Sequence, residues 1–180
     1  MVPVNLPGSD ADSRMVILQG DIVHQDVDAI VNAANCTLLG GGGVDGAIHR
    51  AAGKKLLAEC KTLGGCLTGE ARITKGYELE ARHVIHAVGP VYRDGKHGEP
   101  ELLALAYRRS LGLASEHALR TVAFPAVSTG VYRYPKDEAA RIALGTVKQW
   151  LATHRLPERV TFVLFSEGDL KVYREALETL

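Results

Sequence analysis

The chain has 180 residues, of which 46% are hydrophobic and 23% are charged. Such a chain is long enough to bury one core and too apolar to be disordered. Lysine and arginine together number 21, as do aspartate and glutamate. Because the sequence lacks the basic excess of proteins that hold long nucleic acids, we expect no direct nucleic-acid groove.

Residues 1–14 lack the apolar segment of a signal peptide, and no apolar run approaches the length of a transmembrane helix. We therefore expect a loose N-terminal leader over 1–14, one domain over 15–180, and a cytoplasmic protein with no membrane partner. The three cysteines, Cys36, Cys60 and Cys66, are odd in number and do not follow the spacing of a metal site. They indicate reduced thiols, and we expect neither a metal nor another cofactor.

Apolar runs and helical periodicity predict the elements. In chain order they are a strand over 15–18, a strand over 29–31 ended by Asn32, a helix from about 44 through 56, a break at 64–65, strands over 71–74 and 83–88, a helix over 103–114, a strand over 121–124, a helix over 139–150, a strand over 160–165 and a helix over 170–180.

Strands alternate with helices along most of this order, which predicts a three-layer α/β/α sandwich around a mixed, largely parallel central sheet. The strands over 71–74 and 83–88 leave no room for a helix between them, so we expect an antiparallel step there. Ligands of such folds bind at the carboxyl ends of the strands. The loops after Val31, Phe124 and Phe165 should meet at that end.

A glycine-rich segment over 40–46 precedes the first long helix. Its Gly41-x-Gly43-x-x-Gly46 string matches the dinucleotide-binding pattern, but the preceding strand ends too early for that motif. Consecutive glycines still allow close backbone approach to a ligand, and the helix start offers free N–H groups to a phosphate. The alternative is a flexible surface loop.

Several polar side chains accompany this segment. In the Asn32-Ala33-Ala34-Asn35 string, an amide side chain suits the hydroxyls of a ribose, although asparagines also shape turns. Asp45 and His49 are four residues apart on one helix face, and Asp45 lies in the first turn. They could orient a water molecule, or be an ordinary surface pair. Cys36 has no adjacent base, so we do not expect it to be a nucleophile.

The segment over 128–135 is a second small-residue loop that leads from a strand into a helix. Its sequence is Ser-Thr-Gly-Val-Tyr-Arg-Tyr-Pro. The backbone of such a loop can hold an anion, and its tyrosines offer a face to a sugar or a base.

Taken together, the chain from Met15 onward resembles the macrodomain family, in the branch of ADP-ribosyl hydrolases and O-acetyl-ADP-ribose deacetylases. The resemblance rests on the order and spacing of five strings: Gly20-Asp21-Ile22, Asn32-Ala33-Ala34-Asn35, Gly40 through His49, Ala87-Val88-Gly89-Pro90, and Ser128 through Pro135. Arg133 departs from the family pattern, in which glycine is common at this position. The resemblance implies the same three-layer fold.

The resemblance also implies residue roles. Asp21 would hydrogen-bond the adenine amino group with Ile22 beside it, and Phe165 would pack against the adenine. The diphosphate and the distal ribose would be held by Gly42, Gly43, Val44, Ser128, Gly130, Val131 and Tyr132.

For the chemical step, the resemblance implies that Asn35 holds the distal ribose, Asp45 positions or activates water, and His49 supports Asp45. The reaction would be metal-free hydrolysis of an ester at the distal ribose, in Asp- or Glu-linked mono-ADP-ribosylated proteins or in O-acetyl-ADP-ribose. Attack at the anomeric carbon and attack at the acyl carbon both stay open. The alternatives are a reader that binds ADP-ribose without turnover and a phosphatase acting on ADP-ribose 1″-phosphate. Asn35 and Asp45 favour the enzyme.

Overall fold

One mixed sheet organises the computed structural model, which describes residues 4–5 and 10–180. Its strands lie in the order β1-β2-β7-β6-β3-β5-β4. The strands from β2 to β5 in this order are parallel to their neighbours, and β1 and β4 pair antiparallel at the two edges. The strands are β1 (Val4–Asn5), β2 (Met15–Gln19), β3 (Ala29–Ala33), β4 (Ala71–Lys75), β5 (His83–Ala87), β6 (Thr121–Phe124) and β7 (Arg159–Leu164).

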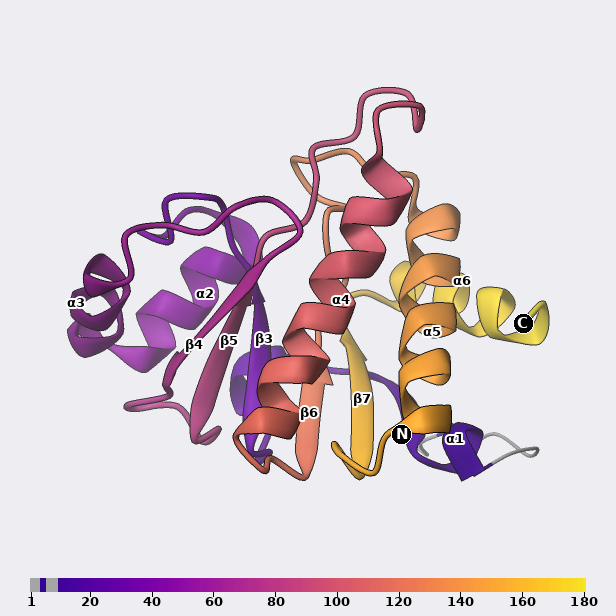
Figure 1. Cartoon of the computed structure of the whole chain (residues 1–180), viewed down its shortest axis with the longest axis horizontal. Coiled ribbons are helices and arrows are strands. Elements are labelled where there is room, and N and C mark those ends of the chain that lie inside the picture. The colour runs from indigo at the N-terminus through magenta and orange to yellow at the C-terminus, as the bar shows by residue number, and fades with distance from the viewer. Residues whose placement is uncertain (1–3, 6–9) are drawn as a thin grey trace.

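Helices connect the parallel strands and cover both faces of the sheet. They are α1 (Asp10–Ser13), the short 3₁₀ helix η1 (Ile22–His24), α2 (Gly43–Ala52), α3 (Lys54–Thr62), α4 (Glu99–Glu116), α5 (Lys136–Thr153) and α6 (Glu167–Glu178). Figure 1 shows α4 and α5 across the front of the sheet, with α2 and α3 at its other side. No helix in the described part of the chain is both long and apolar enough to cross a bilayer.

Two apolar cores lie on the two faces of the sheet. The larger one packs side chains of α4, α5 and α6 against residues such as Val31 and Ile85, and the smaller one packs η1, α2 and α3 against Ile30 and Val84. Neighbouring residues of one strand thus belong to opposite cores, as the alternation of side chains in a strand requires. This arrangement confirms the predicted three-layer sandwich and the antiparallel step between β4 and β5.

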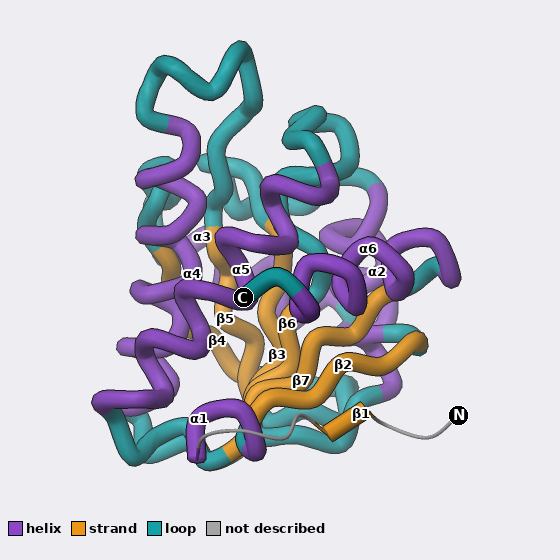
Figure 2. Tube along the Cα trace, turned by 90° about the vertical axis from the view of Figure 1, so that its right-hand side faces the viewer, coloured by secondary structure: helices purple, strands orange, loops and turns teal. Residues whose placement is uncertain are grey.

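The predicted loose leader is wrong for the described residues before Met15. Val4 and Asn5 pair with Ile17 and Val16 of β2 (Figure 2). In α1, Ala11 is buried in the larger core. The Arg14 guanidinium ties α1 to the end of α5 by donating to the backbone carbonyls of Leu151, His154, Arg155, Pro157 and Glu158. Residues 1–3 and 6–9 of the predicted leader lie outside the described part.

Two other sequence predictions also need correction. The helix predicted from 44 through 56 is two helices. Gly53 adopts φ +84°, and its N–H donates to the His49 carbonyl, which ends α2. A side chain at Gly53 would also collide with the Glu78 carboxylate. Asn32 does not end its strand: it lies inside β3 and is fully buried. The remaining helix and strand boundaries differ from prediction by a few residues, mostly at frayed or capped ends.

Candidate functional site

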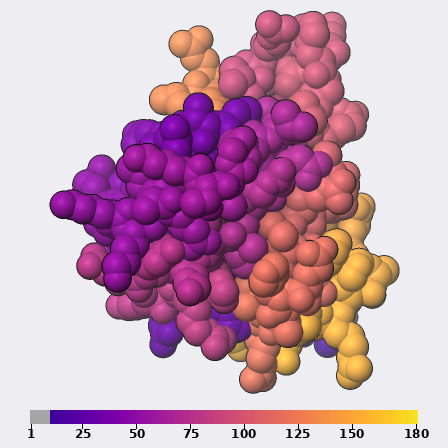
Figure 3. All heavy atoms as spheres, turned by 60° about the vertical axis from the view of Figure 1, so that its left-hand side comes forward, coloured from indigo at the N-terminus to yellow at the C-terminus, as the bar shows by residue number. Residues whose placement is uncertain are grey.

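The site lies at the carboxyl edge of the parallel strands, as the sequence predicts. The loops after β2, β3, β5, β6 and β7 all leave the sheet there, because these strands share one direction. Figure 1 shows the loops after β3, β5 and β6 above the sheet. In Figure 3 the loop near residue 130 and the loop near residue 95 project beyond the surface formed by the early part of the chain.

The start of α2 gives this edge a group of free backbone donors. The N-cap residue, Gly42, supplies no side-chain cap to the helix. The first N–H groups of a helix have no acceptor within it, so those of α2 are available to an anion. A Cβ added at Gly42 would meet no atom within 4 Å, and Gly43 adopts φ +57°. This local geometry therefore favours glycine at Gly43 and leaves open space at Gly42.

Asn35 both shapes the loop and faces the helix start. Its Oδ1 accepts from the Thr37 backbone N–H at 3.1 Å and from the Thr37 hydroxyl at 2.6 Å, and its Nδ2 donates to the Gly40 carbonyl at 3.1 Å. One of the two amide hydrogens on Nδ2 is left by these bonds. The turn-shaping interpretation is thus confirmed, and a donor still remains for a ligand.

Asn35 and Asp45 converge beneath Gly41. A Cβ at Gly41 would lie 3.1 Å from Asp45 Oδ2 and 3.4 Å from Asn35 Nδ2. The structure therefore brings together two of the three predicted catalytic side chains, with a glycine where a side chain would crowd both. His49 Nε2 lies 3.4 Å from Asp45 Oδ1, which places the third beside them.

Asp45 is buried, so it is not part of an ordinary surface pair, the alternative that the sequence left open. It is 5% exposed, and its Oδ1 accepts a hydrogen bond of 2.8 Å from Asn32 Nδ2. Asn32 in turn lies 3.1 Å from His86 Nδ1, and both are fully buried. The register of the sheet explains this contact, because Asn32 and His86 are directly paired in β3 and β5. Sequence reasoning assigned no role to His86 and left Asn32 open between a ribose contact and a turn residue.

The loop after β6 is strained and packed against the loop after β5. Ser128 and Arg133 adopt φ +66° and +60° although neither is glycine. Arg133 donates its N–H to the Gly130 carbonyl at 3.0 Å, so the turn forms with arginine at this position. Ser128 is buried beside Gly89, where a Cβ would come within 2.1 Å of Ser128 Oγ. This close approach explains the glycine of the Ala87-Val88-Gly89-Pro90 string.

Tyrosines join the two loops. The Tyr92 N–H donates to the Tyr132 carbonyl at 2.8 Å, and the Tyr92 and Tyr134 rings lie 4.9 Å apart. The pKa of the Tyr132 hydroxyl is raised by burial, by Cys36 and by Asp45. Tyr132 therefore lies in the electrostatic range of the Asp45 carboxylate. Val131, by contrast, is 90% exposed at the tip of the loop.

The ends of β2 and β7 bring Asp21 near Phe165, since these strands are neighbours. Asp21 caps η1 by accepting from the Val23 N–H at 3.1 Å through Oδ1. Phe165 follows β7 and is 78% exposed. The Ile22 side chain is buried in the smaller core, which leaves its backbone as the part that can face a ligand.

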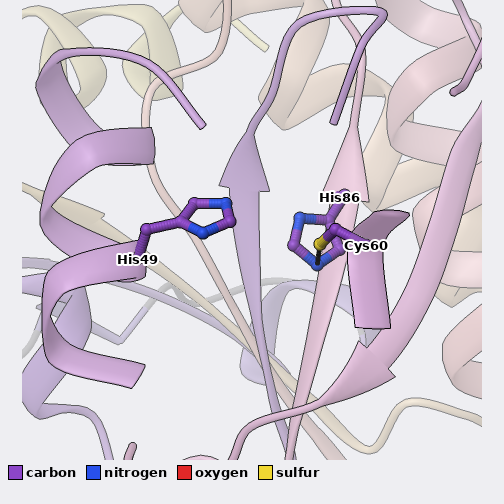
Figure 4. A group of neighbouring side chains, drawn as sticks. All are labelled: His49, Cys60 and His86. Carbon is purple, nitrogen blue, oxygen red and sulfur yellow. Dashed lines mark hydrogen bonds between the residues drawn. The ribbon is translucent and has the colours of Figure 1, made fainter. Parts of the chain in front are cut away.

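Three potential metal ligands also meet below the site. The ligand atoms of His49, Cys60 and His86 lie within 4.8 Å of one another (Figure 4). However, both ring nitrogens of His86 already have partners, since Nδ1 contacts Asn32 and Nε2 lies 3.0 Å from Thr74 Oγ1. Burial also raises the pKa of the Cys60 thiol to about 11, which disfavours the thiolate that a metal needs. His86 is therefore already engaged by hydrogen bonds, and this group of side chains does not fit a metal centre.

Comparison with known proteins agrees with this geometry. The family model "Macro domain" matches residues 31–143. The chain belongs to the macro domain family. A macro domain-containing protein of Chlorobaculum tepidum is 63% identical over 160 residues, which are 89% of this chain and 93% of the relative. The mouse ADP-ribose glycohydrolase MACROD2 is 54% identical over 91% of this macrodomain, which spans 35% of that longer protein.

Solved structures resemble this macrodomain as well. The Trypanosoma brucei macrodomain in complex with ADP-ribose is 46% identical, with a TM-score of 0.88, and the match covers 95% of this chain and 72% of that one. The Oceanobacillus iheyensis macrodomain with ADP is 45% identical, with the same TM-score, over 92% and 90% of the two chains. These similarities confirm the fold.

Proposed function

We propose that this macrodomain is a hydrolase that releases ADP-ribose from proteins modified on Asp or Glu, and that it also deacetylates O-acetyl-ADP-ribose. The observation that carries the proposal is the convergence of Asn35 and Asp45 under Gly41, at the uncapped start of α2. The relatives named as ADP-ribose glycohydrolases, and the neighbours solved with ADP or ADP-ribose, support a nucleotide of this kind as the ligand.

In this proposal the ligand lies along the carboxyl edge of the sheet. Asp21 accepts from the adenine amino group through the oxygen that does not cap η1, and the exposed ring of Phe165 packs on the base. The diphosphate lies against the start of α2 and the loop over 128–132, where backbone N–H groups offset its charge. The remaining amide hydrogen of Asn35 donates to a hydroxyl of the distal ribose.

The chemical step needs a water molecule beside the ester. Asp45 Oδ2 is the free oxygen of that carboxylate near Gly41, and it accepts a hydrogen bond from the water and orients it. Attack by water breaks one C–O bond of the ester and releases ADP-ribose and a carboxylic acid. Positioning supplies much of the acceleration, because such an ester is already reactive. The His49 imidazole packs beside Asp45, with its Nε2 3.4 Å from Oδ1.

A turnover assay tests the proposal. Wild-type protein is incubated with a Glu-linked mono-ADP-ribosylated protein and, separately, with O-acetyl-ADP-ribose, and release of ADP-ribose is measured. For the protein substrate, isotope-labelled water identifies the attacked atom, since the label enters ADP-ribose after anomeric attack and the side-chain acid after acyl attack. Binding of ADP-ribose without cleavage of either substrate would refute the enzyme and support a reader. Release of phosphate from ADP-ribose 1″-phosphate alone would instead support the phosphatase.

A further inference from the structure

A buried chain of hydrogen bonds links Asp45 to a histidine with no role in the proposed reaction. It runs from Asp45 through Asn32 to His86, and then to Thr74. All four side chains are less than one-tenth exposed. The members come from α2, β3, β5 and β4, so the chain crosses from the first turn of a helix into the middle of the sheet.

The geometry fixes the protonation of His86. Asn32 Nδ2 carries two hydrogens, and its two partners are Asp45 Oδ1 at 2.8 Å and His86 Nδ1 at 3.1 Å. His86 Nδ1 must then accept, which places the ring hydrogen on Nε2. Nε2 lies 3.0 Å from Thr74 Oγ1, and the Thr74 hydroxyl donates to the Lys75 carbonyl at 3.1 Å. The donor and the acceptor of each hydrogen bond between Asp45 and Thr74 are therefore fixed.

We propose that His86 is a positioning residue for hydrolysis: its Nδ1 orients the Asn32 amide, which holds Asp45 Oδ1 and leaves Oδ2 directed at the water. This inference rests on the proposed function. If Nδ1 did not accept, the Asn32 amide could rotate and present its oxygen to the carboxylate. The two oxygens would repel, and Asp45 would lose the partner that fixes its rotamer.

The environment of His86 keeps the acceptor available. Burial, with a smaller effect of the neighbouring His49, lowers the pKa of His86 to about 3. The ring therefore stays neutral at the pH of the assay, and Nδ1 keeps its lone pair. The ring centroids of His49 and His86 lie 6.3 Å apart, and Figure 4 shows the His49 ring directed toward His86.

Three variants separate positioning from packing. His86→Leu keeps an apolar side chain of similar bulk without an acceptor. His86→Asn can place its Oδ1 where Nδ1 lies and restore the bond to Asn32. Cys66→Ala is the matched control, because Cys66 is buried in the same smaller core but its Sγ donates to the Leu67 carbonyl, outside the path from His86 to Asp45.

The turnover number kcat and the ADP-ribose Kd are measured for each folded variant. His86→Leu should lower kcat roughly ten- to hundredfold, the range expected when a reacting group is misplaced by about 1 Å, and leave Kd unchanged. His86→Asn should recover most of the loss, and Cys66→Ala should match the wild type. Wild-type kcat in His86→Leu, or a His86→Asn variant no better than His86→Leu, would overturn the proposal, as would a Kd that weakens in step with kcat.

A second measurement applies if His86→Leu does not fold or if the wild type has no turnover. Nitrogen NMR of the histidine rings reports which nitrogen of His86 carries hydrogen, and the Asn32 side-chain amide signals report its orientation. The wild type should show hydrogen on Nε2, and Thr74→Val should shift that hydrogen toward Nδ1 and move the Asn32 signals. Hydrogen on Nδ1 in the wild type would refute the orienting role. Absence of turnover with hydrogen on Nε2 would refute the proposed function alone.

Discussion

Gly89→Ala is the sharpest test of how the two loops fit together. Gly89 does not need a left-handed backbone, so alanine is allowed by its conformation and the effect comes from contact alone. The new Cβ would lie 2.1 Å from Ser128 Oγ and 2.8 Å from Val127 Cγ1. Ser128 must therefore move by about 1 Å, and such overpacking costs about 1–3 kcal/mol. The smaller unfolded-state entropy of alanine offsets about 0.4–1 kcal/mol of this.

We expect Gly89→Ala to lower the free energy of unfolding by about 1–2 kcal/mol. Unfolding in urea measures this change, monitored by the fluorescence of Trp150, the single tryptophan. ADP-ribose affinity should fall with it, because Ser128 belongs to the proposed diphosphate loop. Gly112→Ala, in the interior of α4 with only an ordinary 3.8 Å contact, is the control and should stabilise by about 1 kcal/mol.

A rescue variant makes the argument refutable. Ser128→Gly removes the colliding hydroxyl and suits the φ of +66° at this position. In combination with Gly89→Ala it should return most of the lost stability. If the double variant is as unstable as Gly89→Ala, or if Gly89→Ala unfolds like the wild type, the collision with Ser128 does not explain this glycine.

Three further predictions address the site and its loops. Asp45→Ala should abolish turnover and keep ADP-ribose binding in calorimetry. The control is Asp137→Ala, in the first turn of α5 with Arg141 as its exposed partner, and it should change neither. Loss of binding together with activity would mean that Asp45 holds the ligand. Asp21→Ala should weaken ADP-ribose binding by about 1–3 kcal/mol, as should Asp21→Asn, which keeps the η1 cap; unchanged affinity would refute the adenine contact. Burial raises the pKa of Glu99, but backbone N–H groups outweigh it and lower the pKa to about 2. Glu99→Gln should therefore lower the free energy of unfolding by its full amount above pH 4.5, and this loss should vanish as the pH falls toward 2. A difference between the two proteins that does not change with pH would contradict this.

Local patterns predicted the elements of this fold well because its strands are short apolar runs and its long helices keep a clear period. The direction of the strands followed from the helices between them, and with it the meeting of the loops after Val31, Phe124 and Phe165 at one edge. Gly53 was missed because the apolar period of α2 continues without a shift into α3. The positive φ of Gly53 separates the two helices, and the neighbouring Ala52 carbonyl accepts from the backbone N–H of Glu78, which is distant in the sequence.

Long-range contacts account for the other errors. Asn32 looked like the polar end of a strand, since only the pairing of β3 with β5 shows that it faces His86. A signal was nevertheless present. Asn32 and His86 are polar residues in phase with Ile30 and Val84, which face the smaller core. Polar residues in the buried phase of two strands indicate a hydrogen-bonded pair, because an unpaired one would be too costly.

The same reasoning explains why Asp45 can be buried beside the proposed reaction centre. A carboxylate out of water needs compensation, and here the start of α2 supplies a positive dipole end while Asn32 supplies a hydrogen bond. Asn32 contacts Oδ1 only, and a Cβ at Gly41 would lie 3.1 Å from Oδ2. The hydrogen bond from the sheet thus engages one carboxylate oxygen, and the glycine at position 41 keeps a side chain away from the other, to which we assign the water of the proposed reaction.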